Sequence, residues 1–403
     1  MRYIVLVIIV LFFVNCNKNT EPETLIQGTY KGVFKTQDGQ DIPFIFEVTS
    51  DTSLTIKNAS ERVEVNDIQY KNDSVFIQIP VFEGFISAKL ENKIMKGNLI
   101  TPSLKRSIPF ESEPDSVRFH VVESPEFDIS GNWETVFGPR SEDNGSNAKG
   151  IFTQNGAKVS GTFRTTTGDY RFLDGVMDGN QLKLSTFDGS HVFLFTGNVT
   201  NDSIQGTFYS GNHWKEDFVA WRNEDFELPD ADSLTFLKPG NKTISFTFPD
   251  GEGNELSLDD PRFKDKVVLV QIMGTWCPNC LDESRFLAKY YQENKSKGLE
   301  IIALSFEYAK TEEAAFTNIR RLKENTGIDY PVLLAQYGSS SKNEANAKLP
   351  MLNHVLSYPT LIYIDKTGVV RKIHTGFNGP ATGEKYAEFT SDLDNFVTEL
   401  LNE

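Results

Sequence analysis

The sequence predicts a multidomain protein with a β-rich N-terminal region, made of two related antiparallel β modules, and a C-terminal α/β domain. The length of 403 residues exceeds what a single core usually holds. Residues 24–225 alternate short apolar runs with Gly, Asn and Asp and keep no helical period. From residue 240 onward, buried-type strands alternate with helical segments, which indicates an α/β sheet covered by helices.

The first residues have the pattern of an export signal. Arg2 precedes an apolar stretch, residues 4–14, that is too short to span a bilayer. We therefore expect residues 1–15 to be a lipoprotein signal peptide, Cys16 to be lipidated, and residues 16–23 to form a tether to the membrane. Asn15 departs from the small residue that usually precedes such a cysteine, so plain secretion and an uncleaved anchor are the alternatives. Each alternative places the body of the protein outside the cytoplasm, and the lipoprotein form is expected in a bacterial cell envelope, facing the periplasm.

The two β modules are expected at residues 24–125 and 126–225. The stretch IQGTYKGVF (26–34) aligns with ISGNWETVF (129–137) at an offset of 103 residues, which suggests an internal duplication. The alternative is that all β-rich sequences share strands punctuated by glycine.

The β-rich region shows no catalytic constellation. Its histidines lack the spacing of metal ligands, and its tryptophans are expected in the core, with a ligand pocket as the alternative. These residues are His120, His191, His213, Trp133, Trp214 and Trp221.

Residues 226–239 are expected to be a linker because acidic residues and prolines gather there, and residues 240–403 are the expected C-terminal domain. Within that domain the pattern predicts alternating strands and helices, with Thr311 as a helix N-cap and a turn at residues 365–368. The predicted strands are 244–250, 266–274, 299–307 and two within 360–377, and the predicted helices are 280–298, 310–327 and 383–403.

Cys277 and Cys280 are the only cysteines after Cys16. A disulfide between such close neighbours would close a tiny loop and stabilise the fold little, so a structural role is poorly motivated. The pair lies between a buried strand and a helix, where the partial positive charge of the helix N-terminus favours a thiolate at Cys277. Pro278 suits a first helical turn, Cys280 faces the same way one turn on, and Trp276 is expected to shield one flank of the sulfurs.

Other uses of this motif fit less well. Structural zinc needs four ligands, and a second CxxC pair is absent. Haem attachment needs CxxCH, whereas residue 281 is Leu. We therefore expect no metal and no other cofactor. The net charge of −16 provides no basic surface for phosphates, so we expect no nucleic-acid partner.

Residues from about 240 to 403 resemble the thioredoxin-like domain of exported, membrane-tethered thiol–disulfide oxidoreductases of the TlpA/ResA type. The motifs GTWCPNC (274–280) and SYPTLIYIDKTGVV (357–370) carry the resemblance. It implies a thioredoxin-like fold and a cis peptide bond before Pro359, which Tyr358 and Thr360 flank. It also implies that this loop offers backbone groups to an extended substrate chain next to Cys277.

The sequence departs from the wider thioredoxin pattern in the carboxylate that assists the second cysteine. Thioredoxins carry a buried Asp six residues before the first cysteine, and Gln271 stands there. Glu307 is the expected substitute, with an ordinary loop carboxylate as the alternative. Residues 333–357 look like an insertion near the active-site face.

The expected function is reduction of protein disulfides: Cys277 attacks, Cys280 resolves the mixed disulfide, and an upstream electron donor restores the dithiol. A membrane thiol reductase is one candidate donor, and the lipid anchor would hold the protein at a membrane. A thiol peroxidase is one alternative, although Thr275 stands two residues before Cys277 and the proline of P-x-x-x-T-x-x-C is missing. The other is a ligand- or partner-binding lipoprotein with an accessory redox domain.

Overall fold

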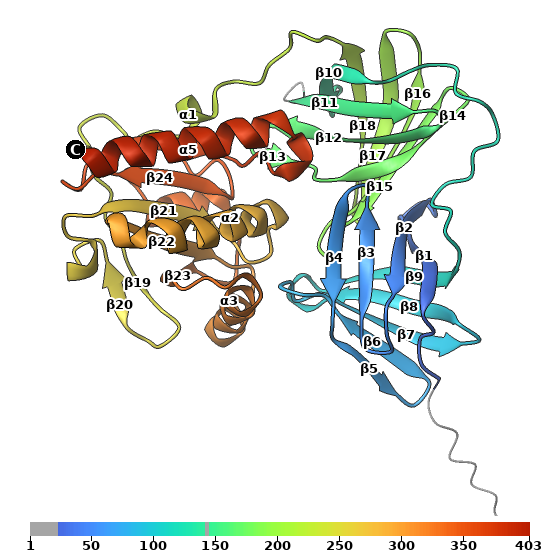
Figure 1. Ribbon diagram of the computed structural model, residues 1–403, viewed down its shortest axis with the longest axis horizontal. Coiled ribbons are helices and arrows are strands. Elements are labelled where there is room, and N and C mark those ends of the chain that lie inside the picture. The colour runs from blue at the N-terminus through green and yellow to red at the C-terminus, as the bar shows by residue number, and fades with distance from the viewer. Residues whose placement is uncertain (1–22, 142–144) are drawn as a thin grey trace, which may run out of the picture.

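A computed structural model describes residues 23–141 and 145–403 (Figure 1). Two β-sheets and an α/β unit follow one another along the chain, and the α/β unit lies to the left of both sheets in Figure 1. Within the described residues, no helix is long and apolar enough to span a membrane. The expected signal peptide and the lipidation site at Cys16 lie outside the described residues.

The first sheet contains nine antiparallel strands in the order β4-β3-β2-β1-β9-β8-β7-β6-β5. Alternation of buried and exposed residues along β1 buries Tyr30 and Phe34, which stack on Phe46 and Phe44 of β2. The strands are β1 (Gly28–Lys35), β2 (Asp41–Val48), β3 (Leu54–Asn58), β4 (Glu61–Val65), β5 (Ile68–Lys71), β6 (Ser74–Gln78), β7 (Phe85–Glu91), β8 (Ile94–Thr101) and β9 (Arg106–Pro114), with the 3₁₀-helix η1 (Pro102–Leu104) before β9.

The second sheet also has nine strands, in the order β11-β10-β18-β17-β16-β15-β14-β12-β13, and β11 pairs with β12 as well. That extra pairing closes the strands into a barrel, which removes the exposed edges of an open sheet. The strands are β10 (Gly131–Phe137), β11 (Ser146–Asn155), β12 (Lys158–Thr165), β13 (Gly168–Asp169), β14 (Leu173–Asp178), β15 (Gln181–Phe187), β16 (Val192–Val199), β17 (Ser203–Ser210) and β18 (Trp214–Arg222).

The expectation that all three N-terminal tryptophans are core residues is wrong for two of them. Trp133 is fully buried in the barrel and donates its indole N–H to the Ile129 carbonyl oxygen. Trp214 and Trp221 are 53% and 46% exposed. Trp221 follows the buried Ala220, so the two-residue period of β18 points it outward, and Trp214 is the first residue of that strand.

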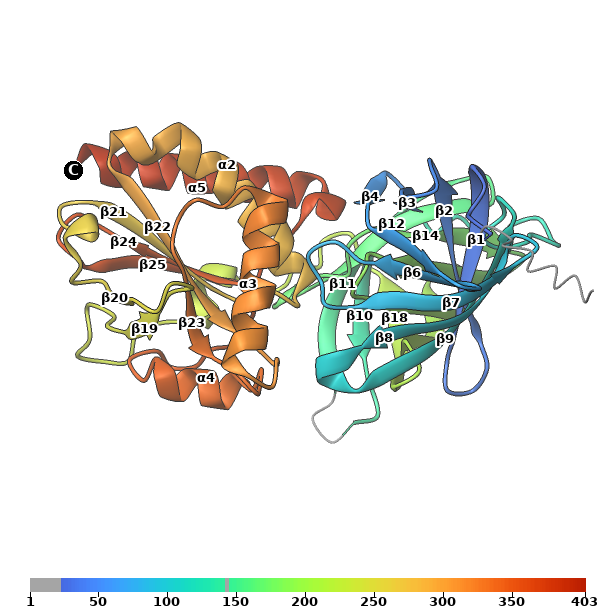
Figure 2. The same cartoon turned by 90° about the horizontal axis from the view of Figure 1, so that it is seen from below.

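The C-terminal unit is a five-stranded mixed sheet in the order β23-β22-β21-β24-β25. Strands β21, β22 and β23 are parallel, while β24 and β25 are antiparallel to their neighbours. Helices α2 and α5 lie side by side on one face of the sheet, and α4 lies on the other side (Figure 2). The main elements are β21 (Val267–Met273), α2 (Pro278–Asn294), β22 (Leu299–Phe306), α3 (Glu312–Thr326), β23 (Val332–Gln336), α4 (Lys342–Lys348), β24 (Thr360–Ile364), β25 (Val370–Thr375) and α5 (Glu384–Asn402).

Several local predictions for this unit are confirmed. Thr311 is the N-cap of α3, and its hydroxyl accepts a hydrogen bond from the Ala314 N–H. The predicted helix over 280–298 ends earlier as an α-helix, at Asn294, and the 3₁₀-helix η3 (Lys295–Lys297) continues it to Gly298, which has φ = 105°. The shorter elements are β19 (Thr247–Pro249), β20 (Glu255–Ser257), η2 (Pro261–Phe263) and η4 (Pro380–Thr382).

Two segments differ from their expected form. Residues 333–357 are not a plain insertion, because they contain most of β23, the parallel edge strand, and the whole of α4. Strand β23 is only five residues long, and so short a run does not show a period that would distinguish a strand from a loop in the sequence. Residues 226–239 contain the helix α1 (Ala231–Leu234), whose Asp232 pairs with His374 of β25.

Candidate active site

Cys277 lies at the junction between the buried strand β21 and helix α2. It is the N-cap of α2, and its Sγ accepts a hydrogen bond of 3.2 Å from the Cys280 backbone N–H. Pro278 occupies the first helical turn, where its missing N–H costs nothing. Cys277 is 7% exposed, whereas Cys280 is fully buried behind it, and both are free thiols. The local sequence therefore presents one sulfur to the surface and keeps the second in reserve.

The loop before β24 lies against the outer sulfur. The Tyr358–Pro359 peptide bond is cis, as the resemblance implied. The Cys277 thiol donates to the Tyr358 carbonyl oxygen over 3.4 Å. The hydroxyl of Thr360, which starts β24, is turned back to the Ser357 carbonyl oxygen at 2.9 Å and so fixes the loop. The Trp276 ring packs edge-on against Tyr358, with ring centroids 5.6 Å apart.

Glu283 is the carboxyl group whose charge reaches Cys280, and sequence reasoning missed it. Glu283 lies on the inner side of α2, is fully buried, and accepts a hydrogen bond of 2.7 Å from the Gln271 side chain. Burial raises the pKa of Glu283 to about 8. The pKa of Cys280 is raised well above its usual value by burial first, then by Cys277, with a smaller contribution from Glu283. The available signal was the spacing of three residues after Cys280, which puts both side chains on one helix face.

Glu307 is buried but serves a different part of the site. Its carboxylate accepts hydrogen bonds from the Thr275 N–H at 2.8 Å, the Thr275 hydroxyl at 2.7 Å and the Ser305 hydroxyl at 2.6 Å. Burial raises the pKa of Glu307, and these three donors lower it. Glu307 therefore holds the turn that precedes Trp276, and is not an exposed loop carboxylate.

The second sheet contacts the cysteine motif directly. Asn279 donates its side-chain amide to the Asp169 carbonyl oxygen at 3.0 Å, and Arg171 donates to the Pro278 carbonyl oxygen at 3.1 Å. Both residues between the cysteines are therefore held by the same short segment of the second sheet. The Ser190 hydroxyl adds a third contact, to the Trp276 carbonyl oxygen at 3.2 Å.

Arg171 is the centre of a buried charge cluster that joins both sheets to α2. Its guanidinium pairs with Glu61 of the first sheet, Asp188 of the second sheet and Asp282 of α2. Burial alone would lower the pKa of Arg171, but these carboxylates together raise it. Burial also raises the pKa of Asp282 and of Glu61, while Arg171 opposes the shift. The contact between the first sheet, the second sheet and α2 therefore depends on the Arg171 side chain, because its removal would leave buried carboxylates without a counter-charge.

A cleft of about 620 Å³ opens above Cys277 between the second sheet and the α/β unit. We call it the active-site cleft. One wall is the loop of residues 165–170 with His191 and Phe193, and the other holds Trp276, Tyr358 and Lys342. The Ser357 hydroxyl donates to the Thr167 carbonyl oxygen at 2.8 Å, so the loop of the second sheet is fixed against the loop before β24.

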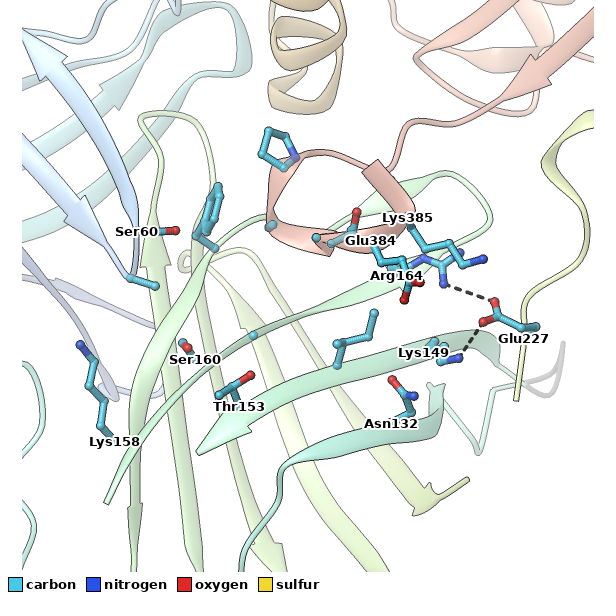
Figure 3. A pocket seen from close by; sticks show the side chains of 18 residues that line it. Ser60, Asn132, Lys149, Thr153, Lys158, Ser160, Arg164, Glu227, Glu384 and Lys385 are labelled. Atoms are coloured by element: carbon cyan, nitrogen blue, oxygen red, sulfur yellow. Dashed lines mark hydrogen bonds and ion pairs between the residues drawn. The ribbon is translucent and has the colours of Figure 1, made fainter. Parts of the chain in front are cut away.

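A separate cavity of about 690 Å³ lies away from the cysteines, between the barrel and the N-terminal end of α5 (Figure 3). Lys149 and Arg164 face it from β11 and β12, and both pair with Glu227. Both cations share the single carboxylate of Glu227, so each already has an ion-pair partner within the chain.

The structure brings together most of the residues that the sequence singled out. The two sulfurs are those of Cys277 and Cys280, and the residues around them include Trp276, Pro278 and Tyr358. Pro359 and Thr360 follow Tyr358 directly in the chain. Glu307 contacts Thr275, which precedes Trp276. The missed residues are Glu283, Gln271 as its partner, and the second-sheet residues Asp169 and Arg171. No sequence signal links residues 169 and 171 to a motif more than a hundred positions later.

Sequence comparison relates the C-terminal unit to known proteins. The family model described as Redoxin matches residues 238–389. The chain is similar to the thioredoxin-like protein YneN of Bacillus subtilis, with 27% identity over 39% of this chain and 81% of that protein. It is also similar to the thiol-disulfide oxidoreductase ResA of Bacillus cereus, with 31% identity over 34% of this chain and 70% of that protein. A solved thiol:disulfide interchange protein from Chlorobium tepidum aligns with a TM-score of 0.31 and 20% identity, over 40% of this chain and 96% of that chain.

Proposed function

This chain belongs to the redoxin family of ResA-type proteins, and from that premise we propose that it is an extracytoplasmic, membrane-anchored thiol–disulfide oxidoreductase that reduces protein disulfides. One observation carries the proposal: the Cys277 Sγ is the N-cap of α2, lies beside the Tyr358 carbonyl oxygen, and has the Cys280 thiol one turn behind it. This is the arrangement that disulfide exchange needs, with an attacking sulfur that lines a cleft and a second sulfur within reach.

The reaction is a two-electron exchange. The Cys277 thiolate attacks one sulfur of the substrate disulfide, so a mixed disulfide forms and the first substrate thiol leaves. Cys280, once deprotonated, attacks the Cys277 sulfur, and the second substrate thiol leaves. The substrate gains two electrons and two protons, and the Cys277–Cys280 pair becomes a disulfide that an upstream donor must reduce.

Glu283 is the best candidate for the group that takes the proton from Cys280. Burial makes the Cys280 thiol hard to ionise, and Glu283 is the carboxyl group whose charge acts on it. A carboxyl group with a pKa of about 8 can exchange protons near neutral pH. The Gln271 amide, 2.7 Å from its carboxylate, keeps the group oriented. Glu307, the carboxylate that the sequence suggests for this role, is proposed instead to position Thr275.

The observations favour this function over a thiol peroxidase. A peroxidase of the usual pattern needs a free threonine hydroxyl near the reactive sulfur. Thr275 is only 3% exposed, and its hydroxyl donates a hydrogen bond to the Glu307 carboxylate. The contacts of the second sheet with Pro278 and Asn279 also argue against an independent accessory redox domain.

The membrane attachment and the domain limits are further parts of the proposal. We infer lipidation at Cys16, with residues 16–23 as a tether, β modules at 24–125 and 126–225, and the thioredoxin-like domain at 240–403. A duplication of the β modules is supported by matching strand pairings. In each module the first strand in the sequence pairs with the second and with the last: β1 pairs with β2 and β9, and β10 pairs with β11 and β18. The aligned residues Gly28 and Gly131 begin these two strands.

The decisive measurement is the reduction potential of the Cys277–Cys280 pair by redox-buffer titration. A value near or below about −250 mV, towards the roughly −270 mV of thioredoxin, supports a reductase, and a value near about −120 mV reverses the direction. Cys280→Ser should trap a mixed disulfide with substrate, whereas Cys277→Ser should not react. Absence of any reversible two-electron transition would sink the proposal.

A further inference from the structure

A second cavity adjoins the active-site cleft. It measures about 290 Å³ and is lined by residues of both sheets and of the α/β unit, among them Arg106, His213 and Tyr308. We call it the side cavity. Trp276 and His191 line both spaces, so the cleft and the side cavity meet at these two side chains. Together they form one path past Cys277; Lys342 lines the cleft and Arg106 lines the side cavity.

This path is lined by all three parts of the chain. Cys277 is only 7% exposed beneath the second sheet, and the wall of that sheet is fixed by the contact between Thr167 and Ser357. Both volumes are those of small-molecule or short-peptide sites, about 300–1,000 Å³. A disulfide on the surface of a compact folded domain would meet the second sheet before reaching Cys277.

The charge of the path contrasts with the rest of the molecule. The chain carries a net charge of −16, yet the permanently charged side chains that face this path are mainly the cations Lys342 and Arg106. Among the described residues, neither side chain forms an ion pair. Desolvation lowers the pKa of both side chains, and for Lys342 the charge of Cys277, which lines the same cleft, opposes this effect.

The neighbouring carboxylates are already engaged or face elsewhere. The Asp169 carboxylate accepts the Gly379 N–H at 2.7 Å and the Arg171 N–H at 2.9 Å. Glu83, near Tyr308, accepts from the N–H and the hydroxyl of Ser103. Glu344 lines a different cavity, although its charge also helps to raise the pKa of Tyr358. None of these carboxylates forms an ion pair with Lys342 or Arg106, so both cations can still bind an anionic ligand.

We propose that the active-site cleft and the side cavity select a slim disulfide whose flanking groups carry carboxylates, with Lys342 binding such a group in the cleft and Arg106 binding one in the side cavity. The inference rests on the proposed function and adds the chemical class of the substrate. Either an extended acidic segment of a protein or a small acidic disulfide meets the description. The disulfide is reduced to two thiols by the Cys277–Cys280 dithiol, which becomes a disulfide, so electrons and protons balance.

The test uses the purified full-length chain, reduced beforehand, in single-turnover reactions. One probe series consists of the disulfide dimers of acetylated, amidated Glu-Cys-Glu, Gln-Cys-Gln and Lys-Cys-Lys peptides. The other consists of dithiodipropionate, hydroxyethyl disulfide and cystamine. Each rate is divided by the rate of the same probe with dithiothreitol, a small reductant that also attacks as a thiolate, which corrects for differences in intrinsic reactivity.

We expect acidic probes to react about tenfold or more faster than basic ones after this division, since charge complementarity raises association rates by 10–10³. Added salt should shrink the ratio. Lys342→Gln and Arg106→Gln should each lower it severalfold. Lys348→Gln, on the same helix, and Lys105→Gln, next to Arg106, are the matched controls and should leave it unchanged. A preference confined to the peptide series identifies an extended chain, and one confined to the other series identifies a small disulfide.

The proposal is overturned if the acidic-to-basic ratio is at or below one in both series, or if neither Lys342→Gln nor Arg106→Gln lowers it. Failure of the proposed function looks different, because then no probe of any charge would react faster with the native chain than with Cys277→Ser. Thermal unfolding of each variant shows whether a lowered ratio reflects lost binding groups and not lost folding.

Discussion

The Arg171 guanidinium of the second sheet donates a hydrogen bond of 3.1 Å to the carbonyl oxygen of Pro278, a residue between the two cysteines. Arg171 also pairs with Asp282 in the first turns of the same helix. The active-site motif is therefore not a property of the α/β unit alone. Its conformation depends on a side chain that precedes it by more than a hundred residues.

Arg171→Gln should lower the free energy of unfolding by about 3–5 kcal/mol, because loss of the cation leaves buried carboxylates uncompensated. Urea unfolding at neutral pH measures this loss. Arg118→Gln is the matched control, since Arg118 is also buried, pairs with Asp174 and joins the first sheet to the second. We expect both variants to be destabilised but only Arg171→Gln to speed alkylation of Cys277. Equal alkylation rates in the two variants would count against a role of Arg171 at the motif.

Gly376→Ala should loosen the second sheet from the active site. Gly376 has φ = 81°, and an added Cβ would lie 2.9 Å from the Thr167 carbonyl carbon. Gly368→Ala is the control, because Gly368 has φ = 85° and nothing within 4 Å of an added Cβ. Both changes cost about 1–2 kcal/mol of backbone strain, but only Gly376→Ala should increase amide hydrogen exchange in residues 165–170. Unchanged exchange there would mean that the loop is held by other contacts.

The buried carboxyl group of Glu283 should make stability depend on pH. Its pKa is about 8 in the folded chain, whereas an unfolded Glu has a pKa of about 4.3. The folded state thus retains a proton that the unfolded state releases. This contribution to stability is complete below about pH 4.3 and is lost as pH rises towards 8, by up to about 1.4 kcal/mol per pH unit.

Glu283→Gln should remove this contribution while keeping an oxygen that accepts from Gln271. The difference in unfolding free energy between the variant and the native chain should therefore grow in favour of the variant from about pH 4.3 to pH 8. Urea unfolding across this range measures it, and the comparison cancels other titrating groups such as Asp169, whose pKa burial raises to about 6. Parallel curves for the two proteins would show that Glu283 does not titrate as stated.

Thr275→Val should destabilise the turn before Trp276 by about 1–3 kcal/mol, because it removes one donor from the buried Glu307 carboxylate. Thr275→Ser keeps the hydroxyl and is the control. Thermal unfolding compares the two. If the serine variant loses as much stability as the valine variant, the methyl packing of Thr275 matters more than its hydrogen bond.

The sequence predicts the parts of this protein that depend on local pattern. The buried run of β21, the N-cap at Thr311 and the cysteine pair at the start of α2 all follow from neighbouring residues. Strand β23 was missed because its five residues are too few to show a period. The exposed position of Trp221 does not follow from its residue type, because tryptophan is usually buried; it follows from the two-residue period of β18, which turns Trp221 outward.

The part of the site that sequence reasoning could not reach is built by tertiary contacts. Glu307 was expected to serve Cys280, but its three donors tie it to Thr275 and Ser305. Glu283 takes the place beside Cys280 because of the helix face it occupies. Asp169 and Arg171 have no local signature, since an isolated buried charge becomes meaningful only once its partners are placed around it.

The hydrogen bonds from Arg171 to Pro278 and from Asn279 to Asp169 have a consequence for protein engineering. The dipeptide inside a CxxC motif is the natural place to retune a redox enzyme by exchanging residues, since those positions influence the reactivity of the cysteines. In this chain the same two positions also fasten the second sheet. A dipeptide transplanted from a single-domain relative would therefore change both the redox behaviour and the packing of the second sheet against the α/β unit. The two effects could be separated only by changing residues 169–171 in the same variant.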